Sequence, residues 1–401
     1  MNAGLLTFYH THHYGTFLQA YATQQAVEAL GAQCTLLDYH TGKKNTLFRK
    51  PQSVGSAVDN LHTSAHYKDL KRRYDRFEQA KATHLRKSSI RFHSSLDLAK
   101  GCPEVDVLLT GSNQIWNAKL SPSGQFDPVF FGDFSHKRKI AYAPSFGSSQ
   151  LPPQLSGDLA GYLSHFSHVS VRERQGAEMV KDATGQDVPV VLDPTLLLSK
   201  KQWAALAVPP KQTGGYILCY CIHKESAMAS YVRQLSKRTG LPIVQLCGVS
   251  QKVHPKATCV LDAGPQEFLG LFQNASYVCT NSFHGTVFST VFEKPFFSSV
   301  SLAEIHSPNR SRTYNLLSTL GLTQRIIGKG DTAGLLDPID YQAVANTLAQ
   351  ARDHSLSYLK AALQNVPFVP QSASTPQPFP SWRPMMFALA VPPAPPPAPR
   401  R

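Results

Sequence analysis

The chain has 401 residues, of which 42% are hydrophobic and 16% charged, and its formal net charge is +14 at pH 7. This length suits two or three domains, and the apolar content excludes a wholly disordered or fibrous chain. The charge is uneven, because residues 41–100 contribute +9 and residues 365–401 contribute +3 together with 12 of the 29 prolines, so we expect a nearly neutral body with one basic segment and one proline-rich tail.

Short apolar runs alternate with helical patterns from the N-terminus onward, a rhythm typical of βαβ units and parallel sheets. The strands expected in the first half are 3–9, 34–39, 105–110, 140–144, 169–172 and 188–192. The helices expected there are 17–30, ended by Gly31, and a strongly basic helix at 65–87. We assign residues 1–205 to a first Rossmann-like domain with a basic helical insertion at about 41–100.

Pro209-Pro210 and Gly214-Gly215 indicate a linker, after which a second series of alternating elements begins. Its expected strands are 216–222, 243–247, 258–261, 277–280 and 296–300. One expected helix ends at residue 238, and the others span 266–274, 285–292, 312–321 and 341–364. We therefore predict an α/β protein in which a second Rossmann-like domain, residues 206–364 with closing helices, faces the first across a cleft. Residues 365–401 are expected to be a disordered proline-rich tail.

Several common classes of protein are disfavoured. No run approaches the ~20 apolar residues of a membrane span, and the N-terminus lacks the pattern of a signal peptide. The seven scattered cysteines form neither a redox motif nor a zinc motif. The chain also lacks the motifs of nicotinamide enzymes, P-loop NTPases, zincins and serine hydrolases. We expect a reduced, cytoplasmic protein.

The strongest candidate site is the run Thr280-Asn281-Ser282-Phe283-His284-Gly285, which directly follows an expected strand and opens a helix. Free backbone N–H groups and the helix dipole favour an anion at such a place. A histidine beside a bound anion keeps its proton and can act as a general acid, whereas a buried structural histidine is the alternative. His284 is thus the candidate catalytic residue. The candidate substrate-binding residues of this run are Asn281, Ser282, Phe283 and Gly285.

Two loops that follow expected strands could reach the same cleft. Asn113 and Gln114 place polar side chains after the strand at 105–110, although a turn with a helix cap would explain them as well. Arg172 leaves the sheet where it could hold a phosphate or carboxylate in bidentate fashion, or could pair with a nearby acid.

Two further segments supply candidate residues. Near the N-terminus, Tyr14 and Gly15 close a loop in which the glycine either lets backbone approach a ligand or simply forms a turn. Arg310 and Arg312 precede a helix and either bind an acceptor or cap that helix.

Six motifs in these places, taken together and in order, resemble the polysaccharide pyruvyl transferase family over about residues 1–330. They are Tyr14-Gly15 with Leu18-Gln19-Ala20-Tyr21, Gly111-Ser112-Asn113-Gln114-Ile115-Trp116-Asn117, Tyr142-Ala143-Pro144-Ser145-Phe146-Gly147, Ser170-Val171-Arg172-Glu173, Leu192-Asp193-Pro194-Thr195 and Thr280–Gly285. The resemblance implies a glycosyltransferase-B-like pair of domains, phosphoenolpyruvate as donor and a pair of glycan hydroxyls as acceptor. The products would be a ketal-linked pyruvate and phosphate. It also implies that His284 is the general acid and Arg172 an anion ligand.

This reaction suits the residues identified above. Protonation of the methylene carbon C3 makes C2 of phosphoenolpyruvate cationic, so an acid must stand near C3 while hydroxyls attack C2. Protein cations can hold the donor's charges, and we therefore expect no metal and no cofactor. Two positions depart from the family pattern: Ser282 stands where many members have arginine, and Asn113 stands where aspartate is usual. The positive charge that anchors the phosphate would then have to come from Arg172, Arg310 or Arg312.

We expect the enzyme to act on a cell-surface glycan, such as an exopolysaccharide, or on its lipid-linked precursor. The basic 65–87 helix would meet an anionic acceptor or anionic lipid at the inner membrane face. One alternative is a glycosyltransferase of the same fold that uses a nucleotide sugar. Another is a non-enzymatic protein whose basic helix binds nucleic acid or membrane, but the segment has few aromatic residues to stack on bases, so we expect no nucleic acid partner.

Overall fold

The first sheet consists of six parallel strands in the order β3-β2-β1-β4-β5-β6. The strands are β1 (Asn2–Leu6), β2 (Gln33–Tyr39), β3 (Lys87–Phe92), β4 (Val107–Thr110), β5 (Arg138–Ala141) and β6 (Phe166–Val169). This is the strand order of dinucleotide-binding folds. The order reverses between β1 and β4, so the loops that leave these two strands diverge and open a crevice at the carboxyl edge of the sheet.

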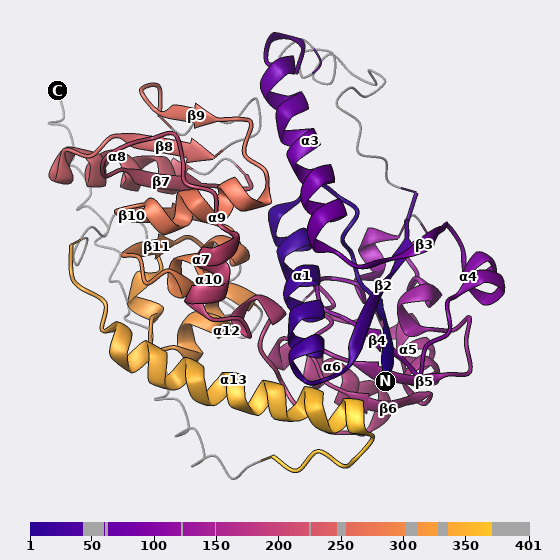
Figure 1. Cartoon of the computed structure of the whole chain (residues 1–401). Helices are drawn as coiled ribbons and strands as arrows, with labels where there is room; N and C mark the ends of the chain where they lie inside the picture. The colour runs from indigo at the N-terminus through magenta and orange to yellow at the C-terminus, as the bar shows by residue number, and fades with distance from the viewer. Residues whose placement is uncertain are drawn as a thin grey trace, which may run out of the picture. The chain divides into compact units, whose positions relative to one another are not determined.

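The second sheet has five parallel strands in the order β11-β10-β7-β8-β9. They are β7 (Ile217–Tyr220), β8 (Ile243–Leu246), β9 (Thr258–Val260), β10 (Tyr277–Thr280) and β11 (Phe296–Ser298). Its switch point lies between β7 and β10. The predicted α/β class with two Rossmann-like sheets is therefore confirmed (Figure 1).

The computed structural model describes residues 1–42, 60, 63–121, 123–148, 150–223, 226–246, 254–300, 311–327 and 336–370. The longer helices in these ranges are α1 (Tyr14–Ala29), α3 (Tyr67–His84), α4 (Ser95–Gly101), α5 (Ser156–Leu163), α6 (Arg174–Thr184), α7 (Lys200–Leu206), α8 (Ser226–Thr239), α9 (Pro265–Asn274), α10 (Phe283–Val291), α12 (Arg312–Thr319) and α13 (Tyr341–Gln364). None of these described helices combines the length and apolarity that a membrane span requires.

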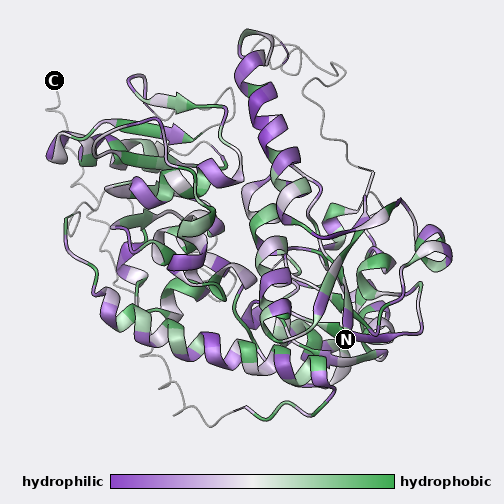
Figure 2. Ribbon diagram, in the orientation of Figure 1, coloured by the Kyte–Doolittle hydropathy of each residue, from purple (hydrophilic) through white to green (hydrophobic). Residues whose placement is uncertain are grey.

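Helix α1 lies between the two sheets and is buried along most of its length, whereas α3 is hydrophilic over much of its surface (Figure 2). The ring of Tyr14 stacks on Phe268 of α9 with centroids 4.6 Å apart, and the Tyr14 hydroxyl donates to the Ala263 carbonyl at 2.9 Å. Buried side chains of both sheets belong to one continuous core. Contacts group Met1–Phe368 into one unit, and the predicted division near residue 205 stays a prediction within it.

Helix α13 contacts elements of both halves (Figure 1). Near its start, the Tyr341 hydroxyl donates to the carbonyl of Lys294, which follows α10. Near its end, the Tyr358 hydroxyl donates to the Ala141 carbonyl of β5 at 2.9 Å. The helix expected to close the second domain therefore also fastens the first sheet.

Some predicted elements differ from the structure. The strand expected at 188–192 is wrong: only an isolated bridge joins Val171 to Val190, since Pro189 lacks the N–H that a ladder needs. The strand expected at 169–172 lies earlier in the chain, as β6. Strand β3 was not expected, because its lysine and arginine obscure the strand pattern that an edge position tolerates. Residues 43–59 of the insertion and 371–401 of the tail lie outside the described residues.

Candidate functional site

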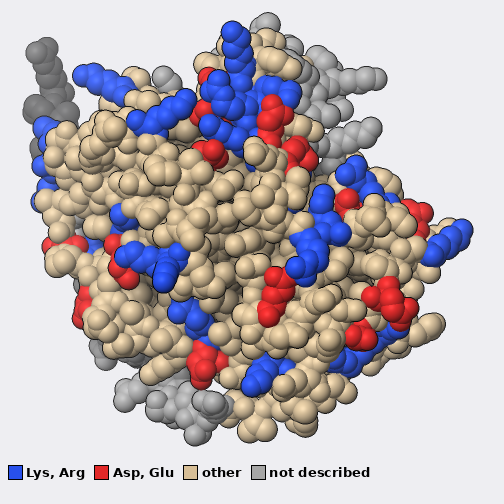
Figure 3. Space-filling model, viewed as in Figure 1, with Lys and Arg blue, Asp and Glu red and all other residues tan. Residues whose placement is uncertain are grey.

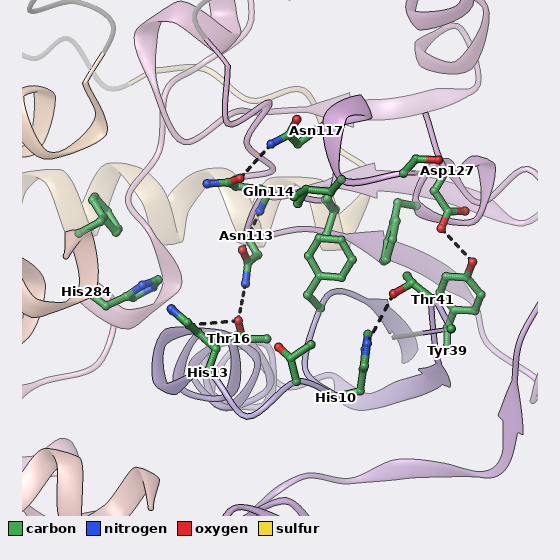
Figure 4. A pocket seen from close by; sticks show the side chains of 18 of the residues that line it. His10, His13, Thr16, Tyr39, Thr41, Asn113, Gln114, Asn117, Asp127 and His284 are labelled. Atoms are coloured by element: carbon green, nitrogen blue, oxygen red, sulfur yellow. Dashed lines mark hydrogen bonds between the residues drawn. The ribbon is translucent and has the colours of Figure 1, made fainter. Parts of the chain in front are cut away.

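A cavity of about 840 Å³ lies at the carboxyl ends of the central strands of both sheets. From the first sheet it receives the loops after β1 and β4, and from the second sheet the loops after β7 and β10 (Figure 4). Both switch points therefore open into one space, which is where ligands bind in folds of this kind. The two halves thus face each other across a shared pocket, as the sequence predicted.

At one end of this cavity, His284 lies beside the buried carboxylate of Asp193. Its Nε2 is 3.7 Å from Asp193 Oδ2, the same oxygen that accepts from Arg172 Nη1 at 2.7 Å. The other carboxylate oxygen accepts from the Thr195 N–H at 3.0 Å and from the Thr195 hydroxyl at 2.6 Å. Burial alone would raise the pKa of Asp193, but His284, Arg172 and Thr195 together lower it. Asp193 is therefore ionised at neutral pH.

His284 itself is almost fully buried, with 6% of its surface exposed. Burial lowers its pKa, the attraction of Asp193 offsets this only in part, and Arg172 adds to the lowering. The imidazole is consequently neutral at pH 7 unless a further negative charge enters. Among the described residues, the buried His284 Nε2 and Arg172 Nη2 have no hydrogen-bond partner. Unpaired buried donors of this kind indicate a place for an anion or an ordered water.

The same end of the cavity is cationic. The guanidinium carbons of Arg172 and Arg312 lie 5.1 and 5.6 Å from the ring centroid of Phe283. With its amide oxygen turned toward Arg312, Gln114 accepts from both terminal guanidinium nitrogens, at 3.2 and 2.9 Å. The loop after β4 in the first sheet and the start of α12 in the second half are thus joined at this point.

The far end of the cavity is aromatic and carries a carboxyl group (Figure 4). The Tyr39 hydroxyl donates to Asp127 Oδ2 at 2.8 Å, and the Val129 N–H donates to Asp127 Oδ1 at 3.1 Å. The rings of Phe8 and Phe130 meet edge to face at 4.8 Å. Burial raises the pKa of Asp127. We call this end, lined by Phe8, Tyr39, Asp127 and Phe130, the distal lobe.

The structure brings about half of the predicted site residues to the cavity wall. These are Asn113, Gln114, Ser282, Phe283, His284 and Arg312. The predicted residues that do not line the cavity are Tyr14, Gly15, Arg172, Asn281 and Gly285. Arg310 lies outside the described residues.

The residues away from the wall have identifiable structural contacts. Asn281 accepts from the Ile222 N–H at 2.8 Å and donates to the His223 carbonyl at 3.0 Å, which fastens the loop after β7. A Cβ on Gly285 would lie 2.1 Å from Thr280 Oγ1, so this glycine allows α10 to start tightly against β10. Arg172 stands behind the cavity wall, in the ion pair with Asp193.

Three residues near the ligand space were not singled out from the sequence. Asp193 belongs to the Leu192–Thr195 motif of the family resemblance, so a signal existed but gave no role. His13 directly precedes the Tyr14-Gly15 motif and lines the cavity. For Asp127 no local pattern was available, because only the fold brings it to the distal lobe.

The basic side chains of the expected 65–87 helix are largely paired within the chain. Arg72 and Arg76 of α3 lie 3.0 and 3.2 Å from Asp262, and Arg76 also lies 3.1 Å from Glu267 of α9. Further pairs join Lys71 to Asp75, Lys81 to Glu78 and Arg86 to Glu28. Acidic side chains are accordingly interspersed among the basic ones over α3 (Figure 3).

Comparison with known proteins gives a family for the chain. A family model described as polysaccharide pyruvyl transferase matches residues 13–301, which is more than two thirds of the sequence. The comparison with curated proteins gave no match. The assignment therefore rests on the family model.

Solved structures are similar only at a distance. The UDP-GlcNAc 2-epimerase of Methanocaldococcus jannaschii is 11% identical, with a TM-score of 0.48 and coverage of 88% of this chain and 94% of the other. The UDP-N-acetylglucosamine 2-epimerase of Rickettsia bellii is 9% identical, with a TM-score of 0.47 and coverage of 91% of this chain and 95% of the other. The ADP-heptose LPS heptosyltransferase II of Escherichia coli is 11% identical, with a TM-score of 0.36 and coverage of 88% of this chain and 98% of the other.

Proposed function

The chain belongs to the polysaccharide pyruvyl transferase family, and from this premise we propose that it transfers pyruvate from phosphoenolpyruvate to two hydroxyls of a glycan as a ketal, with release of phosphate. One observation carries the proposal. A single cavity has a cationic end with a buried His284–Asp193 pair and a distal lobe of a different, aromatic character. Such a division suits a small anionic donor and a larger hydroxyl-rich acceptor.

The donor would bind at the cationic end. Phosphoenolpyruvate carries a phosphate and a carboxylate, and at that end Arg312 and His284 line the wall, with the charge of Arg172 behind it. Arginine is well suited to hold either group because its planar fork can donate two parallel hydrogen bonds. Ser282, which stands where many family members have arginine, adds no charge to the wall. Arg312 therefore supplies the positive charge that would face the donor.

The entering anion would also prepare the catalyst. Its negative charge raises the pKa of His284, and Asp193 stabilises the imidazolium that forms. His284 then gives its proton to C3, and C2 becomes electrophilic. The first hydroxyl adds to C2, the C2–O bond to phosphate breaks, and the second hydroxyl closes the ketal. One hydroxyl proton returns to the histidine and the other leaves with the phosphate, so the protons balance.

The distal lobe would receive the acceptor. A sugar presents apolar C–H faces to aromatic rings and hydroxyls to polar side chains. Phe8 and Phe130 can contact the apolar face of the sugar. Each oxygen of Asp127 retains a lone pair that can accept a hydrogen bond from a sugar hydroxyl. Arg312 is the sole lysine or arginine on the described cavity wall, so an uncharged sugar suits the distal lobe better than an acidic one.

Phosphate release from phosphoenolpyruvate in the presence of candidate acceptor glycans tests this function. We expect release by the wild type that depends on acceptor, and a loss of at least about a hundredfold in His284→Gln, because general acid catalysis contributes about 10²–10⁴. Absence of release by the wild type with every acceptor would contradict the proposal. Thermal stabilisation by a nucleotide sugar but not by phosphoenolpyruvate would instead indicate a glycosyltransferase.

We further propose that the acceptor is lipid-linked and that the protein meets it at the cytoplasmic face of the membrane. The paired charges of α3 leave few basic groups for this contact, of which the exposed Lys68 is one. Sedimentation of the whole chain with phosphatidylglycerol vesicles tests the contact. Binding that weakens steeply with salt would support it, and absence of binding at low salt would contradict it.

A further inference from the structure

His13 is the N-cap residue of α1, and its ring is held by the first turn of that helix. Its Nδ1 lies 3.4 Å from the Thr16 N–H and 3.4 Å from the Thr16 hydroxyl. An imidazole nitrogen that accepts a hydrogen bond carries no proton. The neutral ring therefore has its proton on Nε2, and in the part of the chain that the structure describes no group bonds to that nitrogen.

Asn113 fixes the direction of the hydrogen bond between the Thr16 hydroxyl and His13. Its Oδ1 accepts from the Gln114 N–H at 2.8 Å, which orients the amide so that Nδ2 donates to Thr16 Oγ1 at 3.2 Å. Because Thr16 Oγ1 already accepts, its own hydrogen is available for His13 Nδ1. An aspartate at position 113 would instead accept that hydrogen and take it away from the histidine.

The surroundings of His13 oppose a positive charge on its ring. The charged or titratable groups that face it are Arg73 of α3, Arg312 at the start of α12 and His284 of α10. His13 is exposed on the cavity wall, where partial desolvation by the surrounding atoms, together with the two arginines, lowers its pKa. A helix N-terminus acts in the same direction. The imidazole is thus neutral over the physiological range.

His13 also lies where the donor substrate would bind. It lines the cavity, and its ring centroid is 6.4 Å from that of His284. Figure 4 shows it between His284 and the rest of the pocket, next to Thr16 and Asn113. We propose that His13 is a neutral hydrogen-bond donor that gives its Nε2–H to an oxygen of bound phosphoenolpyruvate, and that Asn113 sets this tautomer through Thr16.

This inference rests on the proposed function and assigns different roles to two adjacent imidazoles. When an anion enters, a proton can go to either ring. Arginines lie near both rings, but Asp193 stands beside His284 and would stabilise a charge there. Protonation of His13 at Nδ1 would instead break the hydrogen bonds that this nitrogen accepts from Thr16. His284 therefore takes the proton and acts as acid, while His13 stays neutral and positions the donor. Environments that separate two titratable groups in this way are typical of acid–base sites.

The tautomer can be measured without any substrate. Long-range ¹H–¹⁵N correlation spectra of the whole chain labelled with ¹⁵N-histidine distinguish a proton on Nε2 from one on Nδ1. The His13 signals are assigned by their absence from His13→Asn. We expect the Nε2–H form at pH 7 in the wild type and a weaker preference for it in Asn113→Asp, where only the Thr16 N–H still donates to Nδ1. The Nδ1–H form in the wild type would overturn the proposal.

Kinetics test the contact with substrate. Asn and Ser are good N-cap residues, so His13→Asn and His13→Ser keep the cap of α1 but lose the Nε2–H group. We expect wild-type thermal stability, a ten- to hundredfold lower kcat/KM for phosphoenolpyruvate, and an unchanged shape of the pH profile. Loss of one limb of the profile would identify His13 as an acid or base instead, and an unchanged kcat/KM would exclude the contact. If the wild type does not turn over phosphoenolpyruvate, the proposed function fails while the tautomer result still stands.

Discussion

Gly15 lies in the first turn of α1 directly against the ring of His284. A Cβ at this position would stand 2.1 Å from His284 Nδ1, so the absence of a side chain accommodates another part of the protein. The sequence offered two interpretations of this glycine, a close approach of backbone to a ligand or a turn, and neither included this neighbour; the ligand contact stays a prediction. This neighbour could not be predicted because His284 lies in α10 of the second half, far from Gly15 in the sequence.

Gly15→Ala should therefore displace the imidazole and reduce the transfer rate at least tenfold. Alanine favours a helix over glycine by about 1 kcal/mol, so loss of activity without loss of α1 is expected. The matched control is Gly161→Ala in α5, where a Cβ would meet no atom within 4 Å. Phosphate release and thermal unfolding of both variants measure the effect. Equal activity of the two variants would show that the ring has room to move.

Asp193 is the second residue on which the site depends. It holds Arg172 and His284 in a fully buried cluster, where removal of one partner costs about 3–5 kcal/mol. Asp193→Asn should lower the free energy of urea unfolding by an amount of that order and reduce activity as well. The exposed pair of Lys200 and Glu293 is the control, because Glu293→Gln should cost less than about 1 kcal/mol. Similar costs for the two variants would contradict the buried role.

At the scale of elements, the basic helix α3 fastens to α9 through its arginines. Arg76 contacts both Asp262 and Glu267, and its Nη1 also donates to the Asp262 carbonyl at 2.7 Å. The sequence predicted the helix and its charge from local composition. It could not predict the partners, because Asp262 and Glu267 lie in the second half and carry no pattern that marks them.

Asp262→Asn should loosen this junction. The variant weakens the contacts of both Arg72 and Arg76, and we expect faster amide hydrogen exchange in α3 and little change in α5, which serves as the internal control. The free energy of unfolding should fall by about 1 kcal/mol, because the pairs are only partly buried. Unchanged exchange in α3 would mean that its apolar face alone holds the helix.

At the scale of the whole molecule, the site exists because two switch points open into one cavity. Each sheet follows a periodicity that the sequence revealed, and β10 with the start of α10 lies within two residues of its expected position. The shared cavity, by contrast, depends on the packing of α1 against α9 and on the span of α13. These are contacts between distant segments, which periodicity does not encode. For the same reason His284 could be proposed from its local motif, whereas its alignment with Asp193 could not.

The pH dependence of stability is also a property of the whole molecule. Desolvation lowers the pKa of His12, His13, His284 and His354 below their ordinary value of 6.5, and for His13 nearby arginines add to this. Below that pH the unfolded chain binds protons that the folded chain does not, so stability falls as the pH drops from about 7 to 5. The ionised Asp193 stabilises the fold throughout this range. Because its pKa is lowered, its contribution to stability is lost only when the pH falls below about 4. Urea unfolding at pH 7.5, 6.5 and 5.5 should show this decline.

Phosphoenolpyruvate should counteract part of the decline. Because the bound anion raises the pKa of His284, binding takes up a proton and the affinity increases as the pH falls from 8 to 6.5. The thermal stabilisation by a fixed concentration of the donor should therefore grow over this range in the wild type. The donor's own phosphate also titrates there, but it does so equally for every variant. His284→Gln isolates the protein's share: its stabilisation should change only as the ligand's titration requires, and the same growth as in the wild type would show that the proton is taken up elsewhere.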